Sequence, residues 1–162
     1  MITNFHELYQ RYAQDIYRFA YWLCADAQAA EDITSETFVN ALTSPGEIRE
    51  ETVKGYLLTI AKNLAFKKSK QEKRFAPLSL ELPETSAGLE QQVENTLELE
   101  RVLHFLQSLP ELDRAALILR TQQELSYEEI ASALEITLVA ARVRVHRARL
   151  KLAAERLSQE EL

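Results

Sequence analysis

Apolar residues recur at three- and four-residue steps along most of this chain, which is the period of an amphipathic α-helix. The pattern predicts helices over residues 5–23, 26–42 and 53–74, and four more over residues 96–106, 110–119, 127–134 and 138–152. Strand and hairpin signals are few, and there are only three glycines and four prolines to break helices. The chain is therefore predicted to be all-α.

The stretch from Ser126 to Lys151 predicts two helices joined by a very short turn. Ser126 is a good N-cap, and Glu129 three residues later can close a capping box with it. Thr137 can cap the second helix, and the apolar stripe of that helix consists of Ala141, Val145, Ala148 and Leu152. Its other face is basic, because no acidic residue occurs from residue 138 to 151. This layout is typical of a DNA-binding helix-turn-helix, although an arginine-rich surface hairpin has the same pattern.

Two earlier helices carry charged faces with more than one interpretation. The helix over 26–42 exposes acidic residues around Asp32, which on the pattern alone is a solvated surface. The helix over 53–74 ends in a basic cluster from Lys62 to Arg74, with Tyr56 and Phe66 among the cations. Cations with interleaved aromatic rings suit a groove for single-stranded DNA. A solvated helix end with two core aromatics explains the same residues and is slightly favoured on the pattern alone.

The net charge of −6 at first disfavours a nucleic-acid partner, but its distribution matters more than its sum. Residues 1–75 carry ten basic and ten acidic side chains, residues 76–95 none and four, and residues 96–162 nine and eleven. Residues 76–95 also contain two prolines and no sustained period, which is typical of a flexible linker. The sequence thus predicts a helical domain over 1–75, an acidic linker over 76–95 and a second helical domain over 96–162.

Several classes of function are disfavoured by what the chain lacks. Cys24 has no cysteine partner, and the three histidines are scattered, so neither a disulfide nor a metal site is expected. No nucleophile–base pair or phosphate-binding loop occurs, and we expect no enzyme activity, no cofactor and no small-molecule substrate. Neither a signal peptide nor a membrane span is indicated, which favours a cytoplasmic protein without membrane insertion.

Three stretches, in this order, resemble the extracytoplasmic-function sigma factors of RNA polymerase, a branch of the sigma-70 family. They are AAEDITSETFVNAL, KGYLLTIAKNLAFKK, and LPELDRAALILR followed by ELSYEEIASALEITLVAARVRVHRARLKL. The resemblance covers nearly the whole chain. It implies a sigma region 2-like domain, an acidic connector and a region 4-like helix-turn-helix domain. The implied partners are core RNA polymerase, through its β′ and β subunits, promoter DNA, and an anti-sigma factor that is itself membrane-bound or cytoplasmic.

The resemblance also implies roles for individual residues. Residues expected to dock on the polymerase are Asp32, Ile33, Ser35, Glu36 and Phe38. Residues expected to engage the melted minus-ten element are Tyr56, Asn63, Lys67 and Lys68. Residues expected at the minus-thirty-five element are Ser126, Thr137, Arg142, Val143, His146 and Arg147.

The chain departs from the usual family pattern at several of these positions. Ser35 replaces a glutamine, Ala140 a threonine and Val143 a small polar residue, while Glu135 replaces the glycine of the turn. A non-glycine residue in the left-handed region costs about 1 kcal/mol, which is tolerable. These departures, with the net acidity, keep two alternatives open: a sigma mimic that binds an anti-sigma factor or polymerase without reading promoters, and a stand-alone helix-turn-helix regulator.

Overall fold

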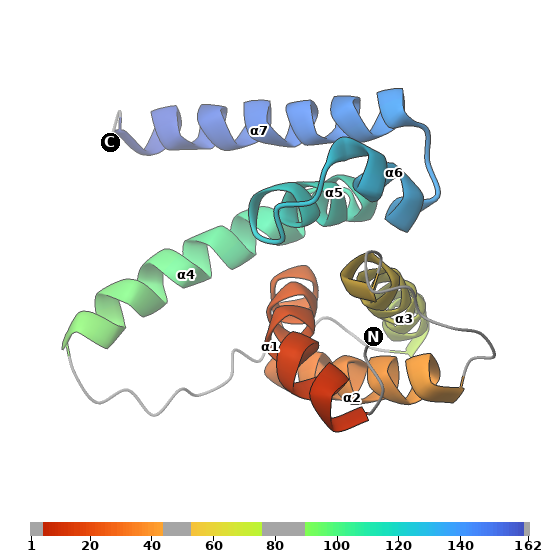
Figure 1. The fold of residues 1–162 in the computed structure, drawn as a ribbon. Coiled ribbons are helices and arrows are strands. Elements are labelled where there is room, and N and C mark those ends of the chain that lie inside the picture. Colours follow the sequence, from red (N-terminus) through yellow and green to blue (C-terminus); the bar gives the residue numbers. More distant parts are fainter. Residues whose placement is uncertain (1–4, 44–52, 76–89, 161–162) are drawn as a thin grey trace.

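The computed structural model describes residues 5–43, 53–75 and 90–160, and within these ranges it contains helices and no strand (Figure 1). The helices are α1 (Phe5–Cys24), α2 (Ala27–Thr43), α3 (Val53–Phe75), α4 (Glu90–Ser108), α5 (Glu111–Thr121), α6 (Tyr127–Leu134) and α7 (Leu138–Glu160). The predicted all-α fold is confirmed. Helix α4 begins at Glu90, before the expected start near residue 96. The greater part of the predicted linker, residues 76–89, lies outside the described residues.

Helices α1, α2 and α3 pack against one another and form the first half of the molecule. Ala25, directly after α1, adopts a left-handed conformation with φ 56°. Asp26 then caps α2 as predicted, because its Oδ1 accepts the backbone N–H groups of Gln28 at 2.9 Å and Ala29 at 3.2 Å. The apolar faces of the three helices meet in a core whose largest fully buried side chains include Ile16, Phe19, Ile33, Phe38, Leu57 and Leu58.

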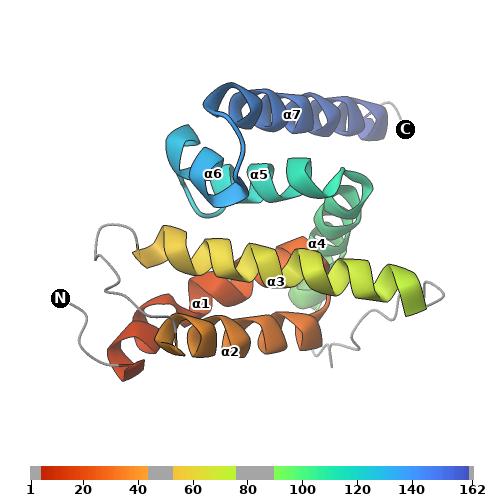
Figure 2. The ribbon, with the colours of Figure 1, turned by 90° about the vertical axis from the view of Figure 1, so that its right-hand side faces the viewer.

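Helix α5 is central to the second half, where it contacts α4, α6 and α7. Pro110 precedes it with φ −53°, and the fixed φ of proline suits a helix start because no N–H is needed there. Ala115, Ala116 and Leu119 are fully buried, so α5 has apolar contacts on more than one side. Figure 2 shows α7 outermost, with α5 and α6 between it and the first three helices.

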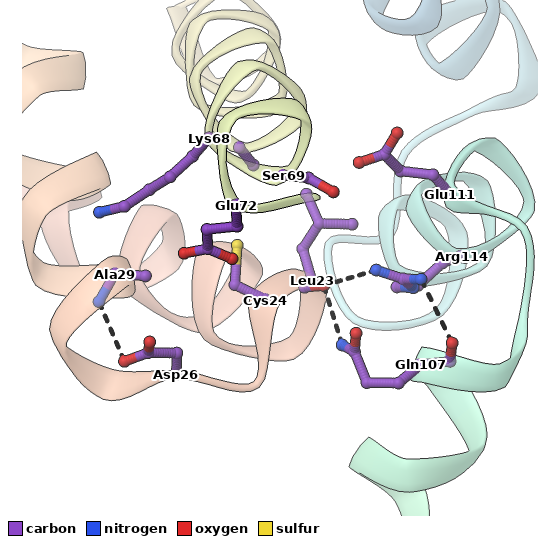
Figure 3. Close-up of a pocket in the computed structure, with 11 residues that line it drawn as sticks. Leu23, Cys24, Asp26, Ala29, Lys68, Ser69, Glu72, Gln107, Glu111 and Arg114 are labelled. Atoms are coloured by element: carbon purple, nitrogen blue, oxygen red, sulfur yellow. Dashed lines mark hydrogen bonds between the residues drawn. The ribbon is translucent and has the colours of Figure 1, made fainter. Parts of the chain in front are cut away.

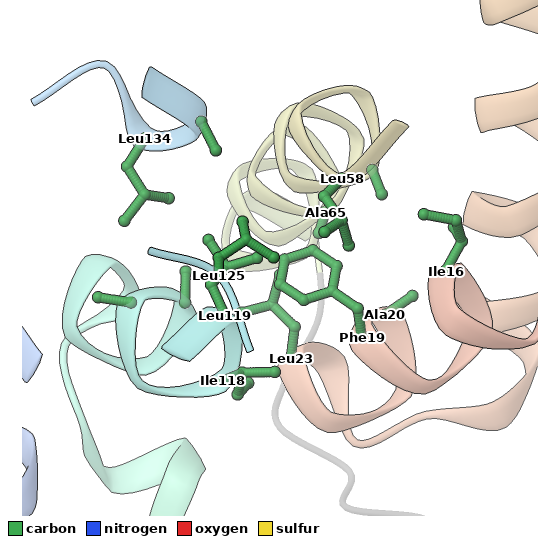
Figure 4. Packing of buried hydrophobic residues seen from close by; sticks show 14 of the residues in the cluster. Ile16, Phe19, Ala20, Leu23, Leu58, Ala65, Ile118, Leu119, Leu125 and Leu134 are labelled. Atoms are coloured by element: carbon green, nitrogen blue, oxygen red, sulfur yellow. The ribbon is translucent and has the colours of Figure 1, made fainter. Parts of the chain in front are cut away.

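One hydrophobic core runs through both halves of the molecule. Helix α1 contacts α4 and α5, and α3 contacts α6. Figure 4 shows Phe19 and Leu23 of α1 beside Ile118 and Leu119 of α5, with Leu125 next to them. Periodicity indicated that each half has an apolar face but left their relative placement open. In this structure the two halves cover each other directly.

Hydrogen bonds to backbone carbonyl groups also cross this interface. Gln107 Nε2 and Arg114 Nη1 each donate to the carbonyl oxygen of Leu23 at 3.0 Å (Figure 3). That carbonyl lies in the last turn of α1, where carbonyl groups lack intrahelical partners and a cation interacts favourably with the helix dipole. Beside it lies a small pocket lined in part by Cys24. Burial raises the pKa of the Cys24 thiol to about 11, so this thiol stays protonated near neutral pH.

Candidate nucleic-acid interface

The predicted helix-turn-helix is formed by α6 and α7. Ser126 Oγ accepts the backbone N–H of Glu129 at 3.1 Å, and Glu129 Oε1 accepts the backbone N–H of Ser126 at 3.0 Å. This reciprocal pair is the capping box that the sequence predicted. It satisfies two of the backbone N–H groups that lack a partner at a helix start, and so fixes the N-terminus of α6 at Ser126.

The turn between the two helices is closed by backbone hydrogen bonds around Glu135. The N–H of Ile136 donates to the Ala131 carbonyl at 3.0 Å and that of Glu135 to the Ser132 carbonyl at 3.4 Å, which is the Schellman arrangement. Glu135 has φ 56° and ψ 46°, so the expected left-handed residue is confirmed. Thr137 Oγ1 then accepts the N–H of Ala140 at 3.1 Å and caps α7.

Ser126 and Thr137, both expected at the minus-thirty-five element, cap the two helices of the motif. The oxygen atoms of Ser126 and Thr137 accept capping hydrogen bonds, and the Ser126 side chain is only partly exposed. Each hydroxyl hydrogen can still be donated outward, since the caps use only the acceptor capacity of the oxygen. Both residues position the backbone whether or not they touch DNA.

Helix α7 has one buried and one exposed face. Of the predicted apolar stripe, Ala141, Val145 and Ala148 are completely buried, and Leu152 is partly buried against the same core. Helix α7 packs on α5 and α6. The four side chains expected to face DNA from this helix, Arg142, Val143, His146 and Arg147, are all exposed. Arg142 and Arg120 approach the ring of Tyr127, with guanidinium carbons 5.8 and 4.3 Å from its centroid. The exposed face is thus basic and is supported by an aromatic ring of α6.

A buried carboxylate that sequence reasoning missed anchors this helix. Asp113 of α5 has no exposed surface, and its Oδ1 accepts a 2.8 Å ion-paired hydrogen bond from Arg144 Nη1. Arg147 Nη1 lies 3.9 Å from Oδ2, which has no hydrogen-bond partner among the described residues. A buried carboxylate is costly unless a cation pairs with it. The ion pair with Arg144 therefore fixes α7 against α5. The sequence signal was an acid three and four residues before the apolar Ala116 and Leu117.

The basic cluster expected on α3 is only partly on the surface. Asn63 and Lys67 are exposed, whereas Tyr56 is half-buried against the core. Lys62 is 4% exposed, with its ammonium group 5.7 Å from the centroid of the Phe66 ring. Burial lowers the pKa of Lys62, and the charge of Glu135 in the turn partly offsets this effect. Including Lys62 in a surface cluster was therefore wrong, because its side chain is buried in the packed fold.

The residues expected to dock on the polymerase divide into two groups on α2. Asp32, Ser35 and Glu36 are exposed, whereas Ile33 and Phe38 are each 1% exposed and belong to the core. The second group can support a docking surface but does not form one in this structure. Two apolar residues that sequence reasoning missed, Val39 and Leu42, are at least half exposed. Their helical spacing places them on the same face as Asp32 and Ser35.

Two of the predicted sites adjoin each other. Lys68 Nζ of the predicted minus-ten set lies 3.4 Å from Asp32 Oδ2 of the predicted polymerase set, and both side chains are partly exposed. Such a solvated pair stabilises the fold by at most about 1 kcal/mol, so either partner can exchange it for another contact. The exposed face of α7 lies elsewhere, because α6 packs between α3 and α7 (Figures 1 and 2).

Beyond these surfaces, the described residues hold no group of three or more His, Cys, Asp or Glu side chains suited to a metal ion. Nor do the same residues include a helix of the length and hydropathy required to cross a bilayer.

Both halves of the chain match models of a known protein family. Residues 8–75 match the family model described as sigma-70 region 2, and residues 99–152 match sigma-70 region 4. The RNA polymerase sigma factor YlaC of Bacillus subtilis is 30% identical over 92% of this chain and 90% of its own length. The ECF RNA polymerase sigma factor SigE of Mycolicibacterium smegmatis is 32% identical over 93% of this chain, which spans only 61% of that protein.

A solved structure shares the arrangement of helices. The sigma factor RpoE of Bartonella quintana, crystallised in complex with the anti-sigma factor NepR, superimposes with a TM-score of 0.66. The match covers 91% of this chain and 93% of that one at 22% sequence identity. At this level of identity the likeness concerns the fold.

Proposed function

This chain belongs to the extracytoplasmic-function sigma factors of the sigma-70 family, and from this membership we propose that it binds core RNA polymerase and directs it to specific promoters. In this role the protein holds two promoter elements at a defined spacing and stabilises the melted downstream strand. No covalent step is required of it. Discrimination between open and closed promoter DNA arises from differential binding, which is the only way a ligand shifts such an equilibrium.

The observation that carries the proposal is the helix-turn-helix of α6 and α7. Its caps and Schellman turn orient α7 so that Arg142, His146 and Arg147 are exposed on one face. Exposed arginines near the start of a recognition helix suit hydrogen bonds to guanine edges and phosphates in the major groove. This face therefore binds the upstream element. Val143 on the same face offers an apolar contact, for which a thymine methyl group is the matching partner.

The first half has the properties needed for the other two contacts. Asn63 and Lys67 project from α3 and suit the phosphates and unstacked bases of a single strand. Asp32, Ser35 and Glu36, with Val39 beside them, offer a mixed acidic and apolar surface to the β′ subunit. Because Lys68 contacts Asp32, polymerase binding at Asp32 releases a cation next to the strand-binding face. Polymerase docking and strand capture are coupled through this pair.

Control by an anti-sigma factor follows from the same assignment. The structurally similar RpoE was crystallised with the anti-sigma factor NepR. We expect such a partner to bind this chain in the cytoplasm, either free or as the cytoplasmic part of a membrane protein. The partner can be sought among small proteins encoded by neighbouring genes, and binding of such a protein to the purified chain would identify it.

Run-off transcription with purified core polymerase tests the proposed function. The expected result is promoter-specific transcript that depends on the added chain. The double variant Asp32→Ala, Glu36→Ala should weaken holoenzyme assembly while leaving the melting temperature within a few degrees. A matched control, Glu98→Ala with Glu128→Ala, removes two exposed acids from α4 and α6 and should assemble normally.

The sigma mimic predicts the opposite pattern in the same assay. It binds an anti-sigma factor tightly, yet core polymerase with the chain yields no specific transcript from any genomic fragment. The departures from family pattern at Ser35, Ala140 and Val143 motivate this second candidate. A stand-alone regulator differs from both, since it binds its duplex site tightly without polymerase, whereas a sigma factor with this charge should bind weakly and lose affinity steeply with salt.

A further inference from the structure

The exposed face of α7 carries an apolar ridge in addition to its arginines. Val143, Leu150 and Leu157 follow one another at seven-residue steps and are 44%, 58% and 62% exposed. Val139, four residues before Val143, is 69% exposed and lies on the same face. We call these four residues the α7 ridge. Figure 1 shows α7 at the outer edge of the fold, with the other helices on one side of it only.

A row of arginines runs along one flank of the α7 ridge. Arg142, Arg149 and Arg156 each immediately precede a residue of the ridge, and all three are exposed. In the heptad notation Val143, Leu150 and Leu157 are a positions and Val139 is a d position, and the two later d positions hold His146 and Ala153. The arginines occupy every g position from 142 to 156. Among the described residues neither Arg149 nor Arg156 forms an ion pair or a hydrogen bond. Single exposed apolar residues need no explanation, but a heptad phase with one charge along its flank is the pattern of a coiled-coil seam.

DNA does not account for the far end of this seam. A recognition helix contacts base edges through its first turns, and the major groove is only about 12 Å wide. Leu157 lies about 28 Å along the axis from Leu138, at 1.5 Å per residue. It also lies beyond residue 152, where the match to sigma-70 region 4 ends. Leu150 and Leu157 therefore need an apolar partner that the major groove does not supply.

A second copy of the chain is a poor partner for this seam. In an antiparallel pair the g positions face each other, so the arginine row would face a second arginine row. In a parallel pair each g position faces an e position of the other helix, and here the e positions hold Arg147 and Ala154. Neither arrangement offers a carboxylate, and like charges in these positions destabilise the pair. Charge thus selects a partner helix with acidic flanks.

We propose that the α7 ridge is a docking site for an acidic amphipathic helix of a partner protein, which packs its apolar face on Leu150 and Leu157 and its carboxylates against Arg149 and Arg156. The second half of the site, from Arg149 to Leu157, lies outside the region that the proposed promoter recognition uses. Its first half overlaps that region at Arg142, Val143, His146 and Arg147. A partner helix long enough to cover the whole ridge therefore excludes upstream DNA from α7. The proposal does not depend on the chain reading a promoter, because the contacts are between two protein helices.

A designed peptide tests the site directly on the full chain. The probe is a fluorescein-labelled peptide of about three heptads with leucine at a and d and glutamate at e and g. Anisotropy should show saturable binding, and the double variant Leu150→Ser, Leu157→Ser should weaken it by about tenfold or more. Arg149→Glu with Arg156→Glu should weaken it similarly, and a peptide with lysine at e and g should bind this variant about tenfold more tightly than the unchanged chain.

Lys151→Glu is the matched control, because Lys151 is exposed next to Leu150 but outside the seam. It should change peptide affinity by less than about twofold at physiological salt. All substituted side chains are exposed, so circular dichroism and melting temperature should remain unchanged. Binding of upstream promoter DNA should also survive Leu157→Ser, which separates this site from the proposed promoter recognition.

Four results would each overturn the proposal. The first is no peptide binding at all, and the second is an equal loss of affinity in Lys151→Glu, which would indicate diffuse attraction. The third is a dimer in sedimentation equilibrium that Leu150→Ser abolishes, since a second copy would then occupy the ridge. The fourth is tighter binding to anionic lipid vesicles than to the peptide, with the same dependence on Leu150 and Leu157.

Discussion

Helices α3 and α7 are similar in length and basic composition, yet the fold uses their cations differently. Helix α3 packs against α1, α2 and α6, so Lys62 is buried beside Phe66 and Lys68 is drawn to Asp32. Helix α7 packs on one side only, and most of its arginines remain exposed. A basic run in a sequence therefore does not by itself define a basic surface. The number of helices packed around it decides how many charges reach solvent.

The largest expected effect separates the two faces of α7. Val145 has no exposed surface, so Val145→Asp buries an unpaired carboxylate and should lower the free energy of unfolding by about 4 kcal/mol. Val143→Asp places the same charge two residues earlier on the exposed face and should change stability by less than about 0.5 kcal/mol. Urea denaturation of both variants makes the measurement. Equal losses would mean that α7 is packed on both sides.

Removing the anchor of α7 should have the next largest effect. Asp113→Ala leaves Arg144 without its buried partner and should lower the free energy of unfolding by about 3 kcal/mol, near the lower end for a broken buried pair because Arg144 can reach water. Asp113→Asn keeps an acceptor for Arg144 and should lose clearly less. Thermal denaturation distinguishes the two variants. If both were as stable as the unchanged chain, the ion pair would have no part in holding α7.

Effects on DNA binding should distinguish α7, which is expected to contact bases, from α3, which is expected to contact phosphates. Arg147→Ala should cost about 1–3 kcal/mol for the preferred upstream sequence and relax specificity at one base pair. Lys67→Ala should instead weaken single-strand binding for all sequences and reduce the slope of log affinity against log salt by about 0.7. Titrations of the holoenzyme at several salt concentrations measure both quantities. A sequence-dependent loss in Lys67→Ala would assign base recognition to α3 as well.

The smallest effect concerns the buried cation of α3 and depends on pH. Burial places the pKa of Lys62 below its ordinary value of 10.5, so the unfolded chain binds more protons than the folded one between those two pKa values. Stability should therefore gain a contribution from Lys62 as the pH rises through that interval. In Lys62→Met this rise should disappear, which denaturation series from pH 7 to 10 can test. An unchanged pH profile would place the Lys62 ammonium group in water.

Resemblance and local pattern together predicted much of the candidate site. The capping box at Ser126, the left-handed Glu135 and the cap at Thr137 are all present. Each depends on residues within five positions along the chain, so a short sequence window contains everything needed. The roles of these residues in DNA binding remain predictions. Asp113 was missed because its partners, Arg144 and Arg147, are about thirty residues away, and nothing local specifies which cations an acid will meet.

The order of helices, their caps and their apolar faces were encoded in the amino-acid sequence alone, because helical period and hydrogen bonding operate over a single turn. Burial is a property of the assembled fold, since it depends on surfaces brought together from distant parts of the chain. Only the tertiary structure could decide that Lys62 is buried, that Ile33 and Phe38 lie in the hydrophobic core rather than on the exposed face of α2, and that the two halves share a core. The same packing left the outer face of α7 without a neighbour in the described residues.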